Sequence, residues 1–349
     1  MRRSTIAFVL GLATLGACDD STSPEVATPT PLEINVGDLP ALPAFVDNPT
    51  TVEGVVLGRR LFHDPIMSGD GTQSCADCHQ QNIAFGDSSR FSLGILGDPG
   101  GRNTQVIVNP GWQEFQFWDG RRETLEDQAR DPVVNPVEMN AEWVRVVERI
   151  SADPTYGDLF VAAFGDAEVS EDRVVMAIAQ FERTFVSAES RFDEKLRGDV
   201  TFTEQEQRGE ALFFDDRAEC FHCHAAPFFT DNEFHDIGLD SVPVDGGRSE
   251  FTMETFDAGK FKTPTLRNIE FTGPYMHDGR FATLEEVVDH YSNGISRSAN
   301  LDATLGVHMN NGESGLELTP DEQADLVAFL KTLTDQAFLT NPSFGPPAG

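Results

Sequence analysis

Two short cysteine motifs constrain this chain more than any other feature. The runs Cys75–His79 and Cys220–His224 both read Cys-x-x-Cys-His. This spacing is typical of c-type haem attachment, because each thiol can form a thioether with one haem vinyl group and the following histidine can bind the iron. The sequence therefore predicts two covalent c-type haems, with His79 and His224 as proximal ligands and with four attachment residues: Cys75, Cys78, Cys220 and Cys223.

Two other uses of such a motif fit the sequence less well. A thioredoxin-like dithiol would lie in a βαβ pattern, which surrounds neither run. A zinc site would need a second ligand pair at matching spacing, and the two runs lie far apart in the chain.

Composition predicts a soluble, acidic, globular protein of about two domains. Hydrophobic residues make up 39% of the 349 residues, and no uninterrupted apolar run follows the N-terminus. The net charge of −33 excludes nucleic-acid binding, since the chain has no basic footprint. Such a charge would instead speed association with a basic protein partner.

The N-terminus predicts export and lipidation. Arg2 and Arg3 precede a short apolar run, which is typical of a bacterial signal peptide at residues 1–17. The run ends in Leu-Gly-Ala-Cys18, which resembles a lipobox, so we expect a lipid on Cys18; the alternative is an ordinary signal peptide with an unpaired cysteine. Residues 18–49, rich in Ser, Thr and Pro at their start, would be a tether and lead-in. The expected location is periplasmic or on the cell surface, with a lipid anchor as the sole membrane contact.

A repeated helix pattern predicts a mostly α-helical fold of two tandem cytochrome c-like domains with long loop insertions. In each unit a helix carrying Leu-Phe precedes the haem motif and an apolar-striped helix closes the unit. We place the first unit at 50–198, the second unit at 199–340 and a tail at 341–349. Capping boxes predict helix starts at Thr203 and Thr319. Segments rich in Gly, Pro, Asn and Asp predict loops at 90–110 and 131–136, and a further insert spans 225–264.

Several further runs are similar, in this order, to those of the bacterial di-haem cytochrome c peroxidases, a family that includes MauG. The resemblance covers residues 52–336. Beside the haem motifs, it rests on Arg102-Asn103, Phe117–Arg121, Val137–Asn140, Ser190–Asp193, Leu266–Ile269 and Pro274–Gly279. It implies that hydrogen peroxide reacts at the His79 haem and that the His224 haem collects electrons.

The resemblance also implies roles for residues that spacing alone does not single out. Glu138 matches the distal acid–base glutamate, which can move a proton between the two peroxide oxygens, and Gln128 matches a neighbouring position. Trp118 matches a tryptophan between the haems that can relay an electron. Without the resemblance, Glu138 would be a solvated acid and Trp118 a core residue. One Ca²⁺ between the domains is implied by three matched positions: Asn103, Thr272 and Pro274.

Two departures separate this chain from many of these peroxidases. They carry a histidine that closes the oxidised first haem, whereas this chain has Phe91–Ile95 at that place and no histidine between His79 and His222. The first haem should therefore be open without reductive activation. At the second haem, where the peroxidases usually offer methionine, this chain has Tyr291, as MauG does.

We expect Tyr291 to be the distal ligand of the second haem. Thr283 and Glu286 predict a capped helix start, after which Tyr291 shares one apolar face with Leu284, Val287 and Val288, while His290 lies off that face. The alternatives are a buried tyrosine that makes no iron contact, or one of four other ligands: Met276, His277, His308 and, as the strongest rival, Met309.

These features favour an enzyme. The first hypothesis is a peroxidase that reduces hydrogen peroxide with electrons from a small, basic cytochrome c or cupredoxin. A variant is a MauG-like oxidase that modifies a protein side chain. A different class is a non-enzymatic di-haem electron-transfer protein, which a distal carboxylate beside an open haem disfavours.

Overall fold

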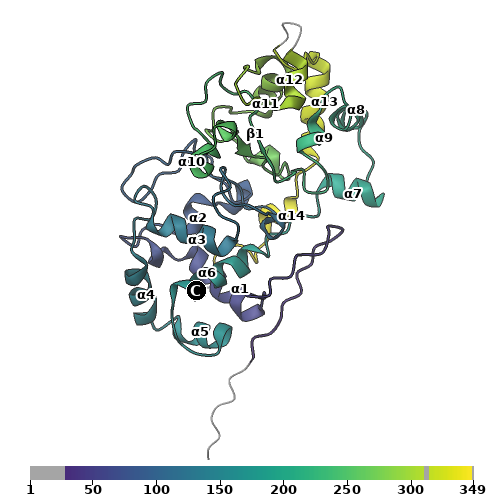
Figure 1. Cartoon of the computed structure of the whole chain (residues 1–349). Coiled ribbons are helices and arrows are strands. Elements are labelled where there is room, and N and C mark those ends of the chain that lie inside the picture. Colours follow the sequence, from purple (N-terminus) through teal and green to yellow (C-terminus); the bar gives the residue numbers. More distant parts are fainter. Residues whose placement is uncertain (1–27, 310–313, 348–349) are drawn as a thin grey trace, which may run out of the picture.

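The computed structural model describes residues 28–309 and 314–347, which form a mostly helical protein (Figure 1). The predicted signal peptide and Cys18 lie outside these residues. Within the described part, no helix has the length and apolar content needed to cross a membrane. The strands β1 (Phe234–His235) and β2 (Phe261–Lys262) pair antiparallel, Phe234 opposite Lys262.

The helices predicted before each haem motif and at the end of each unit are present, together with others that were not predicted. The first unit contains α1 (Val52–His63), α2 (Cys75–Cys78), α3 (Leu125–Val134), α4 (Trp143–Ala152), α5 (Gly157–Phe164), α6 (Glu171–Glu182) and α7 (Arg191–Arg197). The second unit contains α8 (Glu204–Phe213), α9 (Cys220–Cys223), α10 (Ser249–Thr252), α11 (Leu284–Asp289), the π-helical turn η6 (His290–Gly294), α12 (Ala303–Gly306), α13 (Pro320–Lys331) and α14 (Gln336–Thr340). The capping boxes at Thr203, Thr283 and Thr319 are confirmed.

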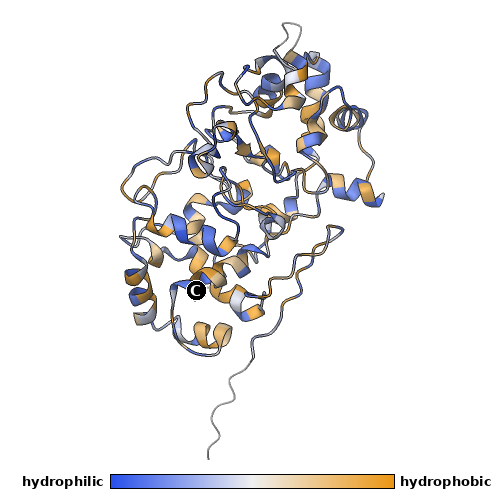
Figure 2. Cartoon of the chain, in the orientation of Figure 1, coloured by the Kyte–Doolittle hydropathy of each residue, from blue (hydrophilic) through white to orange (hydrophobic). Residues whose placement is uncertain are grey.

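Two hydrophobic clusters repeat one packing motif. The first cluster joins α1, α5 and α6, and the second joins α8, α11 and α13; Figure 2 shows hydrophobic residues along α5 and α6. A Cβ on Gly58 would lie 1.9 Å from the Ala177 carbonyl oxygen, and a Cβ on Gly209 would lie 1.9 Å from that of Asp325. Glycine therefore permits the same close crossing, of α1 on α6 and of α8 on α13, ahead of each haem motif.

The C-terminal segment differs from the sequence prediction. Residues placed at the end of the second unit and in the tail pack on the first cluster, where Phe338, Leu339 and Phe344 are buried. Arg59 Nε also donates to the Gly345 carbonyl oxygen at 2.7 Å. Burial of each phenylalanine side chain stabilises the fold by about 1.5–3 kcal/mol, which explains why this segment does not remain a free tail.

The loop predicted at 131–136 is wrong for residues 131–134. Helix α3 continues through Pro132 to Val134, and the Asn135 amide still donates to the Asp131 carbonyl oxygen at 3.0 Å. Proline removes one amide donor, but its fixed φ suits a helix, so the surrounding turns can continue past it.

Candidate functional site: two haem-binding cavities

Each Cys-x-x-Cys-His motif lines a large cavity. The first cavity, about 680 Å³, is lined by Cys75, Cys78 and His79 together with Glu138 and Gln128. The second cavity, about 420 Å³, is lined by Cys220, Cys223, His224 and Tyr291. The fold thus brings each set of predicted attachment and ligand residues around one space.

Both predicted proximal histidines are held in the tautomer that iron binding requires. His79 Nδ1 lies 2.7 Å from the Phe85 carbonyl oxygen, and His224 Nδ1 lies 3.0 Å from that of Phe229. A carbonyl can only accept, so Nδ1 carries the proton and Nε2 keeps its lone pair for a metal. Burial lowers the pKa of both imidazoles, which favours the neutral form that binds iron. These residues fit two c-type haems.

Glu138, the predicted distal carboxylate of the first cavity, has a specific hydrogen-bond partner. Glu138 Oε1 accepts a hydrogen bond from Asn135 Nδ2 at 2.6 Å. Burial raises the pKa of Glu138, against the opposing effects of Asn135 and the Arg121 charge. Sequence reasoning missed Asn135, although its place three positions before Glu138 is the spacing of a local side-chain contact.

The loop at Phe91–Ile95, which the resemblance aligns with the blocking histidine of many peroxidases, is fixed next to Glu138. The Ile95 amide donates to the Glu138 carbonyl oxygen at 3.0 Å. A Cβ on Gly94 would lie 2.2 Å from the Val137 carbonyl oxygen, so only glycine permits this approach. Ser92, Leu93 and Gly94 line the first cavity, whereas Ile95 does not, and the Ser92 hydroxyl is hydrogen-bonded to Asp87 and Thr104. The loop therefore offers no iron ligand there.

A similar turn precedes α3, which lines the first cavity, and α11, which lines the second. Bridges pair Gln116 with Arg122 and Tyr275 with Phe281, and both turns lead into a threonine-capped helix, α3 or α11. Pro132 and Tyr291 are equally spaced from their N-cap threonines, and each lines its own cavity. A proline ring cannot bind iron, whereas a phenol oxygen can. The first cavity is thus open where the second carries a potential ligand.

Tyr291 lies on the predicted face. It lines the second cavity together with Leu284, Val287 and Val288. His290, expected off this face, is nevertheless buried, with its Nε2 3.1 Å from the Ile237 carbonyl oxygen.

Of the four other candidate ligands, the structure places two at the second cavity and two away from its lining. Met276 and His277 also line the second cavity, and the His277 ring stacks on Phe261 with centroids 3.7 Å apart. The strongest rival in the sequence, Met309, does not line it, and neither does His308. The Met309 carbonyl oxygen instead accepts from Arg297 at 2.8 Å.

Trp118 lies between the two cavities and lines both. Its Nε1 donates to the Asn103 carbonyl oxygen at 2.8 Å, which fixes the ring in place. An indole in this position has the placement that an electron relay requires.

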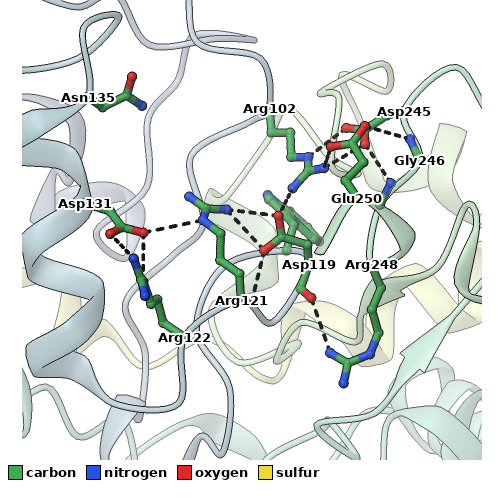
Figure 3. A network of polar contacts seen from close by, with 12 residues as sticks. Arg102, Asp119, Arg121, Arg122, Asp131, Asn135, Asp245, Gly246, Arg248 and Glu250 are labelled. Carbon is green, nitrogen blue, oxygen red and sulfur yellow. Dashed lines mark hydrogen bonds and ion pairs between the residues drawn. The ribbon is translucent and has the colours of Figure 1, made fainter. Parts of the chain in front are cut away.

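A network of ion pairs joins the two units beside Trp118 (Figure 3). Arg102 donates to Asp119 at 2.6 Å, to both carboxylate oxygens of Asp245 at 2.7 Å and to Glu250 at 3.0 Å. Arg248 also donates to the Asp119 carbonyl oxygen at 3.3 Å. Sequence reasoning missed this network, because its members come from distant segments and the chain has many acids.

A third, small cavity of about 70 Å³ gathers the residues matched to a calcium site. Asn103, Thr272 and Pro274 line it, together with Asn232, whose buried Oδ1 has no hydrogen-bond partner among the described residues. Amide, hydroxyl and carbonyl oxygens suit Ca²⁺, and a buried acceptor oxygen without a donor is the kind of atom that a cation can satisfy. The residues therefore fit the ion.

Comparison with known proteins agrees with this geometry. Residues 52–201 match the family model described as di-haem cytochrome c peroxidase. The chain is 40% identical over 299 residues to the methylamine utilization protein MauG of Methylorubrum extorquens, with 84% of this chain and 82% of the relative covered. The chain belongs to the di-haem cytochrome c peroxidase and MauG family.

Two further relatives show the breadth of this family. The cytochrome c551 peroxidase of Nitrosomonas europaea is 36% identical over 315 residues, with 88% of each chain covered. A crystal structure of a MauG-like protein associated with microbial copper homeostasis superposes with a TM-score of 0.82 at 37% identity, covering 88% of this chain and 97% of that one. The family thus contains both peroxidases and MauG proteins.

Membership predicts that both haems are covalent. After denaturation and acid-acetone extraction, two haems per chain should stay on the polypeptide, because each is held by two thioethers. Absorption of the extracted pellet and intact mass measure this directly. Release of either haem would refute the assignment of its motif.

Proposed function

We propose that this protein is a MauG-like di-haem oxidase, which consumes hydrogen peroxide at the first cavity and withdraws electrons from a side chain of a protein substrate. The observation that carries the proposal is Tyr291, which lines the second cavity at the position where Pro132 lines the first. An anionic oxygen ligand stabilises oxidised iron more than a thioether does. The second site would therefore suit the storage of oxidising equivalents.

The residues of the first cavity support the peroxide half of the reaction. Hydrogen peroxide, two electrons and two protons give two waters; bound haem iron would supply the redox chemistry. Glu138 would take a proton from one peroxide oxygen and give it to the other, which leaves as water. Asn135 holds the carboxylate for this task, and Gln128 lines the same space. Trp118 would carry electrons from the second unit.

A second candidate is a cytochrome c peroxidase that draws electrons from a small cytochrome c or cupredoxin. The distal pair of Glu138 and Gln128 serves this reaction equally well, and the Nitrosomonas relative is named a peroxidase. A purely electron-transferring protein is disfavoured, because the first cavity holds a distal carboxylate and no ligand at the position of Pro132.

Rapid mixing of the oxidised holoprotein with one equivalent of peroxide tests the proposal. Without a donor, an oxidase should give an altered absorption spectrum that involves both haems and decays slowly. A peroxidase should give a change that is confined to the first haem and decays rapidly. A spectrum that does not respond to peroxide would overturn both candidates.

We further propose the architecture and surroundings of this enzyme. Two tandem cytochrome c-like domains with loop insertions are supported by the equivalent glycine crossings at Gly58 and Gly209. One Ca²⁺ would be held in the third cavity by Asn103, Thr272 and Pro274, with Asn232 beside them. Export and anchoring through a lipid on Cys18 are supported by the lipobox-like sequence.

A further inference from the structure

Exposed apolar side chains gather on one segment of the second unit. We call residues 239–257, which include α10, the bridging segment. Within it Val242, Val244, Met253 and Phe256 are 77%, 94%, 82% and 59% exposed. Met253 also holds a φ of +61°, a region that favours glycine, while its side chain projects into solvent. Exposed apolar side chains that lie close together, unlike single ones, often mark an interaction site.

The bridging segment passes over both haem cavities. Leu239, Pro243 and Val244 line the second cavity, Phe251 lines the first, and Asp245 lines both. The ion pairs of Asp245 and Glu250 with Arg102 fasten the segment to the first unit (Figure 3). A protein bound on its outer side would thus lie close to both sites of electron transfer.

The charge of the whole chain, more than that of the segment, selects the partner. Four of the five acids in the segment are ion-paired within the chain: Asp240 with Arg280, Asp245 and Glu250 with Arg102, and Asp257 with Lys260. Glu254 makes no ion pair with any described residue and is exposed beside Met253. The chain as a whole carries a net charge of −33. An exposed apolar segment on a strongly acidic protein is complementary to a basic surface with an apolar centre.

We propose that the bridging segment is the docking surface for the protein that supplies the electrons. This partner would be basic and would present apolar side chains close to the group that is oxidised. The proposal rests on the proposed function, because both candidate reactions need a protein reductant. It adds where the reductant binds and which surface it must carry.

The test uses the holoprotein, peroxide and reduced, positively charged cytochrome c as the probe. In the double variant M253K/F256K we expect kcat/KM for the cytochrome to fall by about tenfold or more, since apolar anchors are lost and like charges face the partner. Neither Met253 nor Phe256 lines either haem cavity, so the rate at which a small neutral reductant is oxidised should stay unchanged. The wild-type rate with cytochrome c should also fall as salt is added.

A matched control separates docking from net charge. Val144 and Leu196 are 59% and 63% exposed on α4 and α7, away from both cavities. V144K/L196K adds the same two charges, and its kcat/KM should stay close to wild type. An equal loss in both double variants, or none in M253K/F256K, would overturn the docking proposal. So would a wild type that oxidises the small reductant but not the cytochrome; failure with both reductants would instead overturn the proposed function.

Discussion

Glu138→Gln is expected to slow the reaction with hydrogen peroxide by about 10²-fold or more while both haems stay bound. The substitution keeps the size of the side chain and its contact with Asn135, but it removes the group that can accept and return a proton. Cleavage of the O–O bond would then require an unprotonated leaving oxygen. Stopped-flow absorption of the first haem, mixed with increasing peroxide, measures the rate.

The pH dependence of the same rate gives a second reading. Burial raises the pKa of Glu138 above its ordinary value of 4.5. The carboxylate therefore gains its proton at a higher pH than an exposed acid does, and the wild-type rate should fall as the pH drops through that raised pKa. Glu138→Gln should lose this dependence. Glu148→Gln, on the exposed face of α4, is the matched control; a wild-type rate in Glu138→Gln would remove this carboxylate from the mechanism.

Tyr291→Phe is expected to alter the second haem and leave the first one unchanged. Removal of the phenol oxygen would take away the distal ligand, so the low-spin spectrum of the His224 haem should be lost. The reduction potential of that haem should rise, because an anionic oxygen stabilises ferric iron. Spectroelectrochemical titration follows both haems in one experiment.

Tyr275 provides the control from within the same cavity. It also lines the second cavity, but its hydroxyl already donates to the Ile269 carbonyl oxygen at 2.9 Å. Tyr275→Phe should therefore preserve the spectrum and potential of both haems. If Tyr291→Phe behaves in the same way, Tyr291 is a packing residue and the oxidase proposal loses its main support.

Local patterns in the sequence were sufficient for part of this account. The haem motifs, the capping box at Thr283 and the apolar face ending at Tyr291 each depend on residues within a few turns of one another. The end of helix α3 was predicted as a loop, because Pro132 is a breaker by its chemistry and only the surrounding contacts show that it is tolerated.

Contacts between distant segments could not be predicted from the sequence. Arg102 and Asp245 are far apart in the chain, and nothing local distinguishes this pair from other oppositely charged residues of the protein. The return of Phe344 to the first cluster depends in the same way on a surface that only the folded chain presents. Glu138 was found through the family resemblance, whereas its partner Asn135 required the structure.

Electron paramagnetic resonance of the oxidised protein as purified distinguishes an open first haem, next to Glu138, from a second haem closed by Tyr291. We expect one high-spin ferric signal and one low-spin ferric signal in equal amounts, with no prior reduction. Two low-spin haems would show an unforeseen ligand at the first site, and two high-spin haems would show that Tyr291 binds no iron; either result would overturn the proposed asymmetry between the two sites.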